Sequence, residues 1–175
     1  MVDYTSSSPW DIIWNRPYSN YEKHHQLFWS KIRDVAKGKI LDLGCGSGSC
    51  WKDYPQSITG VDFSKEAIYE AIKNCPGSTF LQCDLHRVMF TSHTFDTTVL
   101  CGVVNYYQNI EGIMREAARL TKPDGQIIIT INVIDDFPDR HWDEERIQKE
   151  FGAYGSIHPQ FFEGVGWLLV ISISQ

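Results

Sequence analysis

The chain has 175 residues, 42% hydrophobic and 22% charged, which is typical of one globular domain with a sizeable core. No apolar run approaches the roughly 18–20 residues that cross a bilayer, and the N-terminus lacks the basic and apolar regions of a signal peptide, so we expect a cytoplasmic protein. The formal net charge of −6 disfavours attraction to a polyphosphate, so a nucleic acid is not the expected partner.

The five cysteines argue by their spacing against both a disulfide framework and a metal site. Their number is odd and no CxxC pair occurs, which is typical of reduced intracellular thiols. The adjacent histidines His24 and His25 fall on a predicted helix, where neighbouring positions point in different directions, so they make a poor metal pair. We therefore expect no bound metal.

The first predicted elements are an arm and a helix. Residues 1–20 are rich in Ser, Pro, Trp and Tyr without periodicity, which indicates an irregular N-terminal arm. From Tyr21 onward an apolar stripe recurs about once per helical turn and predicts an amphipathic helix; its members are Tyr21, His25, Phe28, Ile32 and Val35. Gly38 stands where a C-cap glycine would end this helix.

Beyond Gly38, short apolar strands alternate with helices. Strands are predicted over residues 39–43, 58–62, 79–83, 95–101, 127–133, 157–162 and 167–173. Helices are predicted over 49–54, from an N-cap at Ser64 through the apolar positions Ala67, Ile68, Ala71 and Ile72, over 109–120 and over 142–151. A turn is expected at 123–125 and a hairpin connection at 163–166. The alternation predicts an α/β fold with a mostly parallel sheet and a C-terminal antiparallel hairpin, in a single domain spanning residues 1–175.

A glycine loop follows the first strand and opens a helix. Gly44, Gly46 and Gly48 let the backbone turn tightly and approach a ligand without a Cβ in the way. The helix start offers free backbone N–H groups to an anionic group. The loop alone is ambiguous, because the same pattern also occurs in purely structural turns.

Acidic residues accompany three consecutive strands. Asp42 precedes the glycine loop, Asp62 ends the second strand and Asp84 follows the third. In an open α/β sheet such positions line one crevice, where a carboxylate can accept hydrogen bonds from ribose hydroxyls. Each one taken singly fits a solvated turn, but all three together with the glycines favour a nucleoside-type ligand.

These segments resemble the signature motifs of class I S-adenosylmethionine-dependent methyltransferases. Residues 40–48 resemble the first motif, 60–64 the second and 82–85 the third; Phe95 with Asp96, and residues 120–125, also match. The resemblance covers residues 37–133 densely. It implies a Rossmann-like three-layer αβα sandwich with a seven-stranded, mostly parallel sheet, and S-adenosyl-L-methionine as the cofactor.

The resemblance also implies where the cofactor binds. The glycines would pass its methionine half, and the backbone at Cys101 would contact that half from the next strand. Asp42 would orient the amino group, Asp62 would hold the ribose, and Phe63 would lie against the adenine, with Asp84 and Leu85 at the adenine edge. The expected cofactor-binding residues are Asp42, Gly44, Cys45, Gly46, Gly48, Asp62, Phe63, Asp84, Leu85 and Cys101.

The acceptor side departs from the family's common patterns. Many small-molecule members carry a Glu-His pair just after the fourth strand, where this chain has Asn105 and Tyr106. Residues 103–107 also lack the prolines of the Asn/Asp-Pro-Pro-Tyr motif of amino- and base-methylating members. We therefore expect a small-molecule acceptor and leave the target atom open. Candidate catalytic residues are Tyr106, Tyr107 and His141, with Asp135 and Asp136 nearby, and each has a structural alternative.

The N-terminal arm is a candidate lid over the acceptor. It carries the aromatic residues Trp10, Trp14 and Tyr18, and Tyr21 follows. Large aromatic side chains need burial, either against the domain itself or around an acceptor. The expected substrate-binding residues are Trp14, Tyr21, Asn105 and Tyr106.

Two rival functions remain. A nicotinamide-dependent dehydrogenase would need a glycine where Ser49 stands, and it leaves Asp42 and Asp84 unexplained. A non-catalytic S-adenosylmethionine-binding subunit or regulator is the alternative from another class, because the histidine after the fourth strand is missing.

Overall fold

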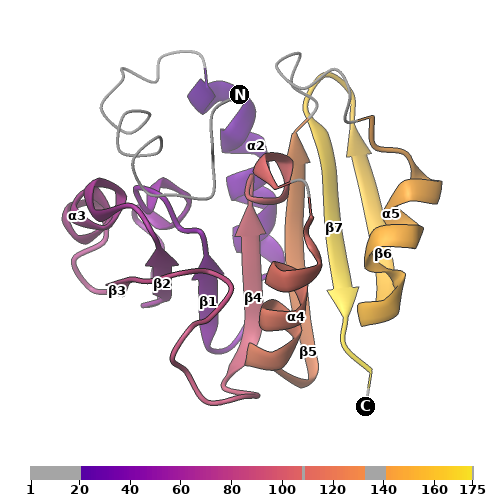
Figure 1. Ribbon diagram of the computed structural model, residues 1–175. Coiled ribbons are helices and arrows are strands. Elements are labelled where there is room, and N and C mark those ends of the chain that lie inside the picture. The colour runs from indigo at the N-terminus through magenta and orange to yellow at the C-terminus, as the bar shows by residue number, and fades with distance from the viewer. Residues whose placement is uncertain (1–20, 108, 133–140, 175) are drawn as a thin grey trace.

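The computed structural model describes residues 21–107, 109–132 and 141–174, with side chains from His25 onward (Figure 1). It contains a seven-stranded sheet in the order β3-β2-β1-β4-β5-β7-β6. The strands are β1 (Ile40–Leu43), β2 (Thr59–Asp62), β3 (Thr79–Gln82), β4 (Phe95–Cys101), β5 (Thr121–Asn132), β6 (Ser156–Phe162) and β7 (Gly166–Ser172). The helices are α2 (Tyr21–Val35), α3 (Lys65–Asn74), α4 (Glu111–Leu120) and α5 (Glu144–Phe151), with short 3₁₀ turns η1 (Ser49–Trp51), η2 (Val104–Tyr106) and η3 (Gly152–Tyr154).

The pairing of the strands confirms the predicted sheet. β3, β2, β1, β4 and β5 pair in parallel, and β7 pairs antiparallel with both β5 and β6. The glycine-rich connection at 163–165 closes the β6–β7 hairpin, and the Val165 amide donates to the Phe162 carbonyl at 3.0 Å. The C-terminal hairpin is therefore as the sequence predicts.

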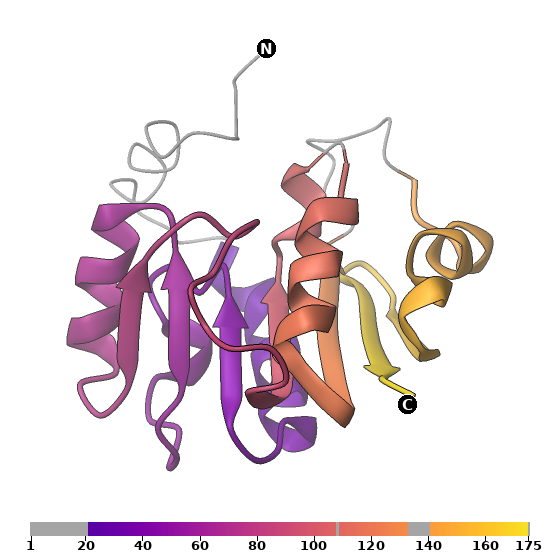
Figure 2. The same ribbon diagram turned by 60° about the horizontal axis from the view of Figure 1, so that its bottom comes forward.

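Helices cover both faces of the sheet, which makes a three-layer sandwich. Figure 2 shows α4 in front of the sheet and α2 behind it. β5 illustrates why both faces are apolar: Ile127, Ile129 and Ile131 pack in one core cluster, with α4 and α5, while Ile128 packs in the other, with α2 and α3. An almost wholly apolar strand is what burial on both faces requires. None of the helices within the described ranges is long and apolar enough to cross a membrane.

Two local predictions differ from the structure. β5 begins at Thr121, which pairs with Phe95, and the expected turn at 123–125 forms an irregularity between that pair and the Thr97–Gln126 pair. Ile72, expected on the buried face of α3, is 51% exposed. α3 packs on the edge strand β3 and its neighbour β2, so the narrow stripe of Ala67, Ile68 and Ala71 already covers the contact.

The strand order creates a crevice at one edge of the sheet. From β1 the chain first moves outward through β2 and β3, then returns to place β4 on the other side of β1. Such a switch point leaves a gap outside the carboxyl ends of the neighbouring strands, where open α/β sheets bind ligands. The glycine loop and the ends of β2 and β4 lie at this edge.

Candidate functional site

The glycine loop takes a backbone conformation that suits glycine. Gly44, Gly46 and Gly48 have φ values of 90°, 52° and 71°. A Cβ added at Gly44 would lie 2.5 Å from Cγ2 of Val103, so the loop also packs too closely for a side chain there. The Gly44 amide donates to the Val61 carbonyl at 2.8 Å, which joins the start of the loop to β2.

Asp62 fastens the loop to the end of β2. Its side chain is 6% exposed, and its two oxygens accept hydrogen bonds from the backbone amides of Gly46 and Ser64, both at 2.9 Å. Ser64 in turn caps α3, because its hydroxyl accepts from the Ala67 amide at 3.2 Å, as predicted. The carboxylate is thus held at the crevice by main-chain donors and can accept further hydrogen bonds from ligand hydroxyls.

Asp42 is a buried carboxyl with one oxygen lacking a hydrogen-bond partner among the described residues. Its side chain is 1% exposed; Oδ2 accepts from Trp51 Nε1 at 2.6 Å, while Oδ1 accepts nothing. Burial, with smaller contributions from the nearby Cys101 and Asp62, raises the pKa of this carboxyl to about 8. An unpaired buried acceptor is unfavourable until a donor or a cation reaches it. Oδ1 therefore fits the amino group of an amino-acid-like ligand.

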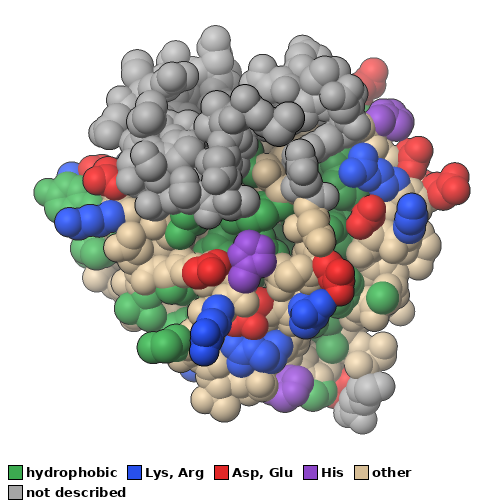
Figure 3. All heavy atoms as spheres, in the orientation of Figure 1, with side chains coloured by type: hydrophobic (Ala, Val, Ile, Leu, Met, Phe, Trp, Pro, Cys, Tyr) green, Lys and Arg blue, Asp and Glu red, His purple; other side chains and the backbone are tan. Residues whose placement is uncertain are grey.

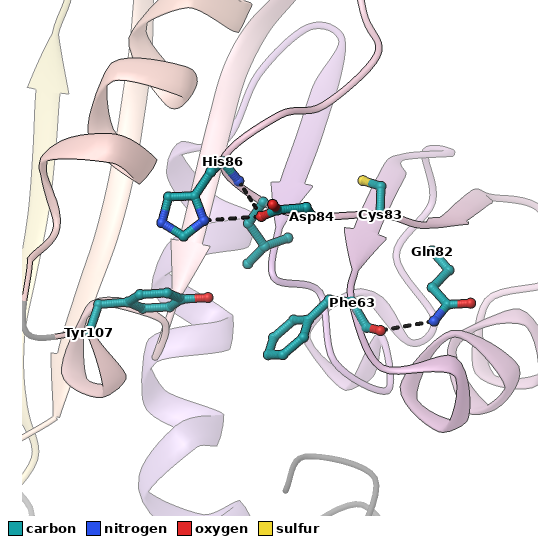
Figure 4. A pocket seen from close by; sticks show the side chains of 7 residues that line it. Phe63, Gln82, Cys83, Asp84, His86 and Tyr107 are labelled. Atoms are coloured by element: carbon teal, nitrogen blue, oxygen red, sulfur yellow. Dashed lines mark hydrogen bonds and ion pairs between the residues drawn. The ribbon is translucent and has the colours of Figure 1, made fainter. Parts of the chain in front are cut away.

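A cavity of about 370 Å³ opens beyond Asp62, at the ends of β2 and β3 (Figure 4). It is lined by Phe63, Gln82, Cys83, Asp84, Leu85, His86 and Tyr107. Asp84 lies at its rim: its Oδ1 accepts from the His86 amide at 2.9 Å and lies 3.0 Å from His86 Nδ1. The hydrogen bond from the His86 backbone lowers the pKa of the Asp84 carboxyl, so Asp84 is an anionic acceptor at neutral pH.

Two aromatic rings form opposite walls of this cavity. Figure 4 shows Phe63 on one side and Tyr107 on the other. The Phe63 carbonyl accepts from Gln82 Nε2 at 3.0 Å, and the Tyr107 ring meets His86 edge-on with centroids 5.5 Å apart. Burial raises the pKa of the Tyr107 phenol well above its ordinary value. The Tyr107 hydroxyl therefore stays protonated near neutral pH, which makes it a poor base and suits a wall for a planar ligand.

The end of β4 is fastened to β5 by side chains. The Gly102 amide donates to Thr130 Oγ1 at 2.9 Å. Asn105, 3% exposed, bonds the Asn132 backbone twice: Nδ2 donates to the carbonyl at 2.8 Å, and Oδ1 accepts from the amide at 3.1 Å. The Asn105 amide thus has a structural task, and its predicted contact with substrate stays a prediction. Tyr106, beside it, is half-buried.

Of the remaining predicted residues, the structure describes the side chain of His141 but not those of the others. Trp14, the side chain of Tyr21, and Asp135 and Asp136 lie outside the described residues. His141 is exposed just before α5, which packs near β6, at the far end of the sheet from the cavity, and its carbonyl accepts from Arg146 Nη1 at 2.9 Å. The structure therefore does not bring His141 to the cavity lining.

His25 is a residue of the crevice that the sequence indicates only as part of an apolar stripe and as half of a poor metal pair with His24. Its Nε2 lies 3.3 Å from Asn132 Nδ2, and its ring carbon Cε1 is 3.6 Å from where a Cβ on Gly102 would be. α2 therefore brings an imidazole to the carboxyl ends of β4 and β5. The signal available in the sequence was a titratable side chain within an otherwise apolar face.

The charge pattern on one described face of the molecule is mixed. On the face shown in Figure 3, Lys and Arg side chains of the described residues are interspersed with Asp and Glu, around a hydrophobic area. No single sign dominates this part of the surface. Such a pattern lacks the basic stripe that phosphate backbones require.

Comparison with known proteins decides the family. The sequence profile described as a methyltransferase domain matches residues 41–129, which is more than half of the chain. The chain belongs to this methyltransferase domain family. The match begins at β1 and ends within β5, so it contains the glycine loop, Asp62, Asp84 and the end of β4.

Curated relatives of this chain differ in what they act on. A malonyl-[acyl-carrier protein] O-methyltransferase of Enterobacter lignolyticus is 22% identical over 71% of this chain and 53% of its own length. A tRNA U34 carboxymethyltransferase of Saccharophagus degradans is 30% identical over 71% of this chain and 45% of its own length. The chain spans about half the length of these relatives.

A solved structure confirms the fold. Magnesium protoporphyrin IX methyltransferase from Synechocystis, determined with bound S-adenosylmethionine, superposes with a TM-score of 0.71 at 19% identity, covering 99% of this chain and 94% of that one. The family and its solved structures support S-adenosylmethionine as the cofactor of this domain.

Proposed function

We propose that this chain is an S-adenosylmethionine-dependent methyltransferase that acts on a small-molecule acceptor. The observation that carries the proposal is Oδ1 of Asp42, which is buried beside the glycine loop and accepts no hydrogen bond from the described residues. A cationic donor in the crevice would supply this hydrogen bond. A methionine amino group is such a donor. Few ligands combine this amino group with a ribose for Asp62 and a planar base for the aromatic-walled cavity.

The chain's own residues divide the binding task. Asp42 would orient the amino group, and the glycine loop with the Cys45 and Cys101 backbone would pass the methionine half. Asp62, fixed by the Gly46 and Ser64 amides, would accept from the ribose hydroxyls. Phe63 and Tyr107 would enclose the adenine, with Asp84 and the Leu85 backbone at its edge. The cavity of about 370 Å³ has the size of a small-ligand pocket.

Catalysis rests mainly on alignment in this proposal. The bound cofactor supplies an activated methyl group on a sulfonium. Holding an acceptor in line with that methyl contributes up to several kcal/mol without any base. A base is needed only when the nucleophile must lose a proton. Asn105 and Tyr106 remain candidates for contacting the acceptor, together with Trp14 and Tyr21.

The acceptor is proposed to be a small molecule. The net charge of −6 and the interspersed charges on the described face support this choice over a nucleic acid. Because one relative is a tRNA carboxymethyltransferase, RNA belongs in the test. The five cysteines are all free, which fits the proposed cytoplasmic residence.

A non-catalytic S-adenosylmethionine-binding subunit is the second candidate. It is favoured by the engagement of Asn105, where many family members carry their histidine, with the Asn132 backbone. It is also favoured by the raised pKa of the Tyr107 phenol. Both observations leave the segment after β4 without an evident base among its described residues.

Two measurements test the proposal in sequence. Calorimetry compares S-adenosylmethionine with NADH, and we expect micromolar binding of the former alone; binding of NADH alone would refute the donor site. Release of S-adenosylhomocysteine is then followed with panels of acyl thioesters, amines, phenols and tRNA. Turnover of a small molecule supports the proposal. Turnover of tRNA alone corrects the acceptor class, and cofactor binding without any turnover favours the regulator.

A further inference from the structure

The connection between β3 and β4 forms part of the cavity rim without belonging to a helix or a strand. It runs from Cys83 to Thr94, and it carries Asp84 and His86, which line the cavity (Figure 4). Irregular segments usually move more than the elements that they join. The position of the rim therefore depends on what holds this connection.

Helix α4 holds the connection through an ion pair between Glu116 and Arg119. Arg119 Nε donates to Glu116 Oε2 at 2.8 Å and Nη2 donates to Oε1 at 2.7 Å, which is the two-point geometry of a strong guanidinium–carboxylate pair. Glu116 is 8% exposed, and Arg119 lies in the last turn of α4. The hydrogen bond from Arg119 is the main cause that lowers the pKa of the Glu116 carboxyl below its ordinary value, so the pair is charged at neutral pH.

Both members of the pair bond the backbone of the connection. At Val88 the amide donates to Glu116 Oε1 at 2.7 Å, and the carbonyl accepts from Arg119 Nη2 at 2.9 Å. Arg119 Nη1 also donates to the Phe90 carbonyl at 2.9 Å. Hydrogen bonds to ionised groups are stronger than those between neutral groups. The pair therefore fixes the main chain of the connection at Val88 and Phe90.

The anchored point lies directly after the turn that forms the rim. The Arg87 amide donates to the Asp84 carbonyl at 3.1 Å, which closes a turn between them. Before this turn the Cys83 amide donates to the Asp62 carbonyl at 2.9 Å, and after it comes Val88. The end of β3 thus brings Asp84 to the cavity, and α4 holds the far end of its turn.

The first turn of α4 also contacts the rim. A Cβ added at Gly112 would lie 2.8 Å from Cδ2 of His86, so the helix backbone packs closely against this imidazole. The His86 amide in turn donates to Asp84 Oδ1 at 2.9 Å. One helix therefore supports the rim from two places, although no described residue of α4 lines the cavity.

We propose that Glu116 and Arg119 are positioning residues through which this domain selects the base of its cofactor. The inference rests on the proposed function, in which Asp84 lies at the adenine edge and accepts from the amino group. The Asp84 side chain is 70% exposed, so it keeps this place only if its backbone is held. A carboxylate that is held before the ligand arrives loses little freedom on binding. Without the anchor, the turn gains other positions and the contact with the amino group weakens.

The contacts proposed for the rest of the cofactor are fixed elsewhere. Asp62 is held by the Gly46 and Ser64 amides, and Asp42 accepts from Trp51. None of these bonds involves α4 or the connection from β3 to β4. Loss of the ion pair should therefore change the selectivity for the base more than the affinity for ribose and methionine.

Paired ligands test the inference by calorimetry. S-adenosylhomocysteine is compared with its analogue in which purine, which lacks the 6-amino group, replaces adenine. The unchanged chain should bind the adenine ligand about tenfold more tightly, and Arg119→Gln should reduce this ratio to about threefold or less. An unchanged chain without this preference would overturn the inference. So would an equal weakening of both ligands by Arg119→Gln, because the pair would then act on stability alone.

Further variants separate positioning from stability. Arg119→Lys keeps a charge beside Glu116 but lacks the planar fork that reaches two carbonyls, so it should lose the ratio while its unfolding midpoint stays nearer that of the unchanged chain. Asp84→Asn should lower the ratio by itself, and adding Arg119→Gln should lower it no further. Arg115→Gln is the matched control and should keep the ratio. It removes an ion pair with Glu111 on the same helix, between side chains 73% and 65% exposed.

Hydrogen exchange of the ligand-free chain distinguishes this inference from the proposed function. Arg119→Gln should speed the exchange of the backbone amides of residues 84–90, that of Val88 most of all, and Arg115→Gln should not. If the unchanged chain bound neither ligand, the proposed function would fail and the base selection with it, while exchange would still show whether the pair holds the connection. Normal binding by the unchanged chain together with unaltered exchange in Arg119→Gln would overturn the inference alone.

Discussion

The two sides of the crevice are built differently. The proposed donor side, at the ends of β1, β2 and β3, consists of short motifs that end or directly follow a strand: the glycine loop, Asp62 and Asp84. The acceptor side, at the ends of β4 and β5, depends on long-range partners: His25 and Asn132 are 107 residues apart in sequence. A local motif needs only its own strand and turn, whereas a contact cluster needs the complete fold.

The same division separates backbone from side-chain chemistry. On the donor side, main-chain amides of the loop and of Ser64 hold Asp62, so geometry is set by positive φ values and strand ends. On the proposed acceptor side, side chains supply the bonds: Asn105 bonds the Asn132 backbone, Thr130 accepts from the Gly102 amide, and His25 contacts the Asn132 side chain. Substitutions should therefore act through conformation on one side and through packing or ionisation on the other.

The largest effect is expected at the loop. Gly44→Ala must fit a Cβ at φ 90°, 2.5 Å from Val103 Cγ2, so we expect a loss of about 2–4 kcal/mol in the free energy of unfolding and roughly a hundredfold weaker cofactor binding. Urea denaturation and calorimetry measure the two quantities. Gly77→Ala is the control, because a Cβ there meets nothing within 4 Å. Equal behaviour of the two variants would contradict a conformational role for the loop.

Asp62 should rank second. Asp62→Ala removes the acceptor of the Gly46 and Ser64 amides and the proposed ribose contact, so cofactor binding should weaken by about 1–3 kcal/mol. Asp62→Asn keeps one acceptor oxygen, so its affinity for the cofactor should lie between that of the unchanged chain and that of Asp62→Ala. Calorimetry with Asp34→Ala, an exposed change on α2, provides the baseline. If Asp62→Ala left the affinity for the cofactor unchanged, the carboxylate would only hold the glycine loop in place and would not bind the ribose.

The third prediction concerns the buried carboxyl of Asp42 and the pH dependence of stability. The folded chain holds this proton up to a pKa of about 8, while the unfolded chain releases it near the ordinary aspartate pKa of 3.8. The folded state therefore binds more protons between these values, and the stability of the cofactor-free chain should fall as pH rises from about 4 to about 8. Asp42→Asn should flatten this slope and add about 1–2 kcal/mol at neutral pH, while weakening cofactor binding. Thermal unfolding across pH 5–9 is the measurement, and a slope shared by both proteins would exclude Asp42 as its source.

The smallest effect is expected at Tyr107. Tyr107→Phe keeps the ring that faces Phe63 and touches His86, so cofactor binding should change by less than about 1 kcal/mol. Tyr107→Ala removes the wall and should weaken binding more than Tyr107→Phe does. Once an acceptor is known, a large fall in turnover for Tyr107→Phe would reveal the base that the raised pKa of this phenol argues against.

Much of the fold could be read from periodicity and turn residues. The N-cap at Ser64, the β6–β7 hairpin and the apolar run of β5 each follow from local chemistry, and each is present. The early start of β5 at Thr121 and the exposure of Ile72 could not be read locally. Both depend on which residues a neighbouring element contacts. The hydrophobic periodicity of a segment does not show how much of its apolar face the neighbouring strands cover.

The sequence by itself determined the glycine loop and predicted the donor half of the candidate site, because glycines and strand-terminal carboxylates are placed by their own strand and turn. Only the tertiary structure revealed the unpartnered oxygen of Asp42, the Phe63 and Tyr107 walls, and the contact of His25 with Asn132. These features arise from burial and from contacts between distant elements. Desolvation and long-range proximity are properties of the packed chain, so they appear only once α2, η1 and the strand ends have come together.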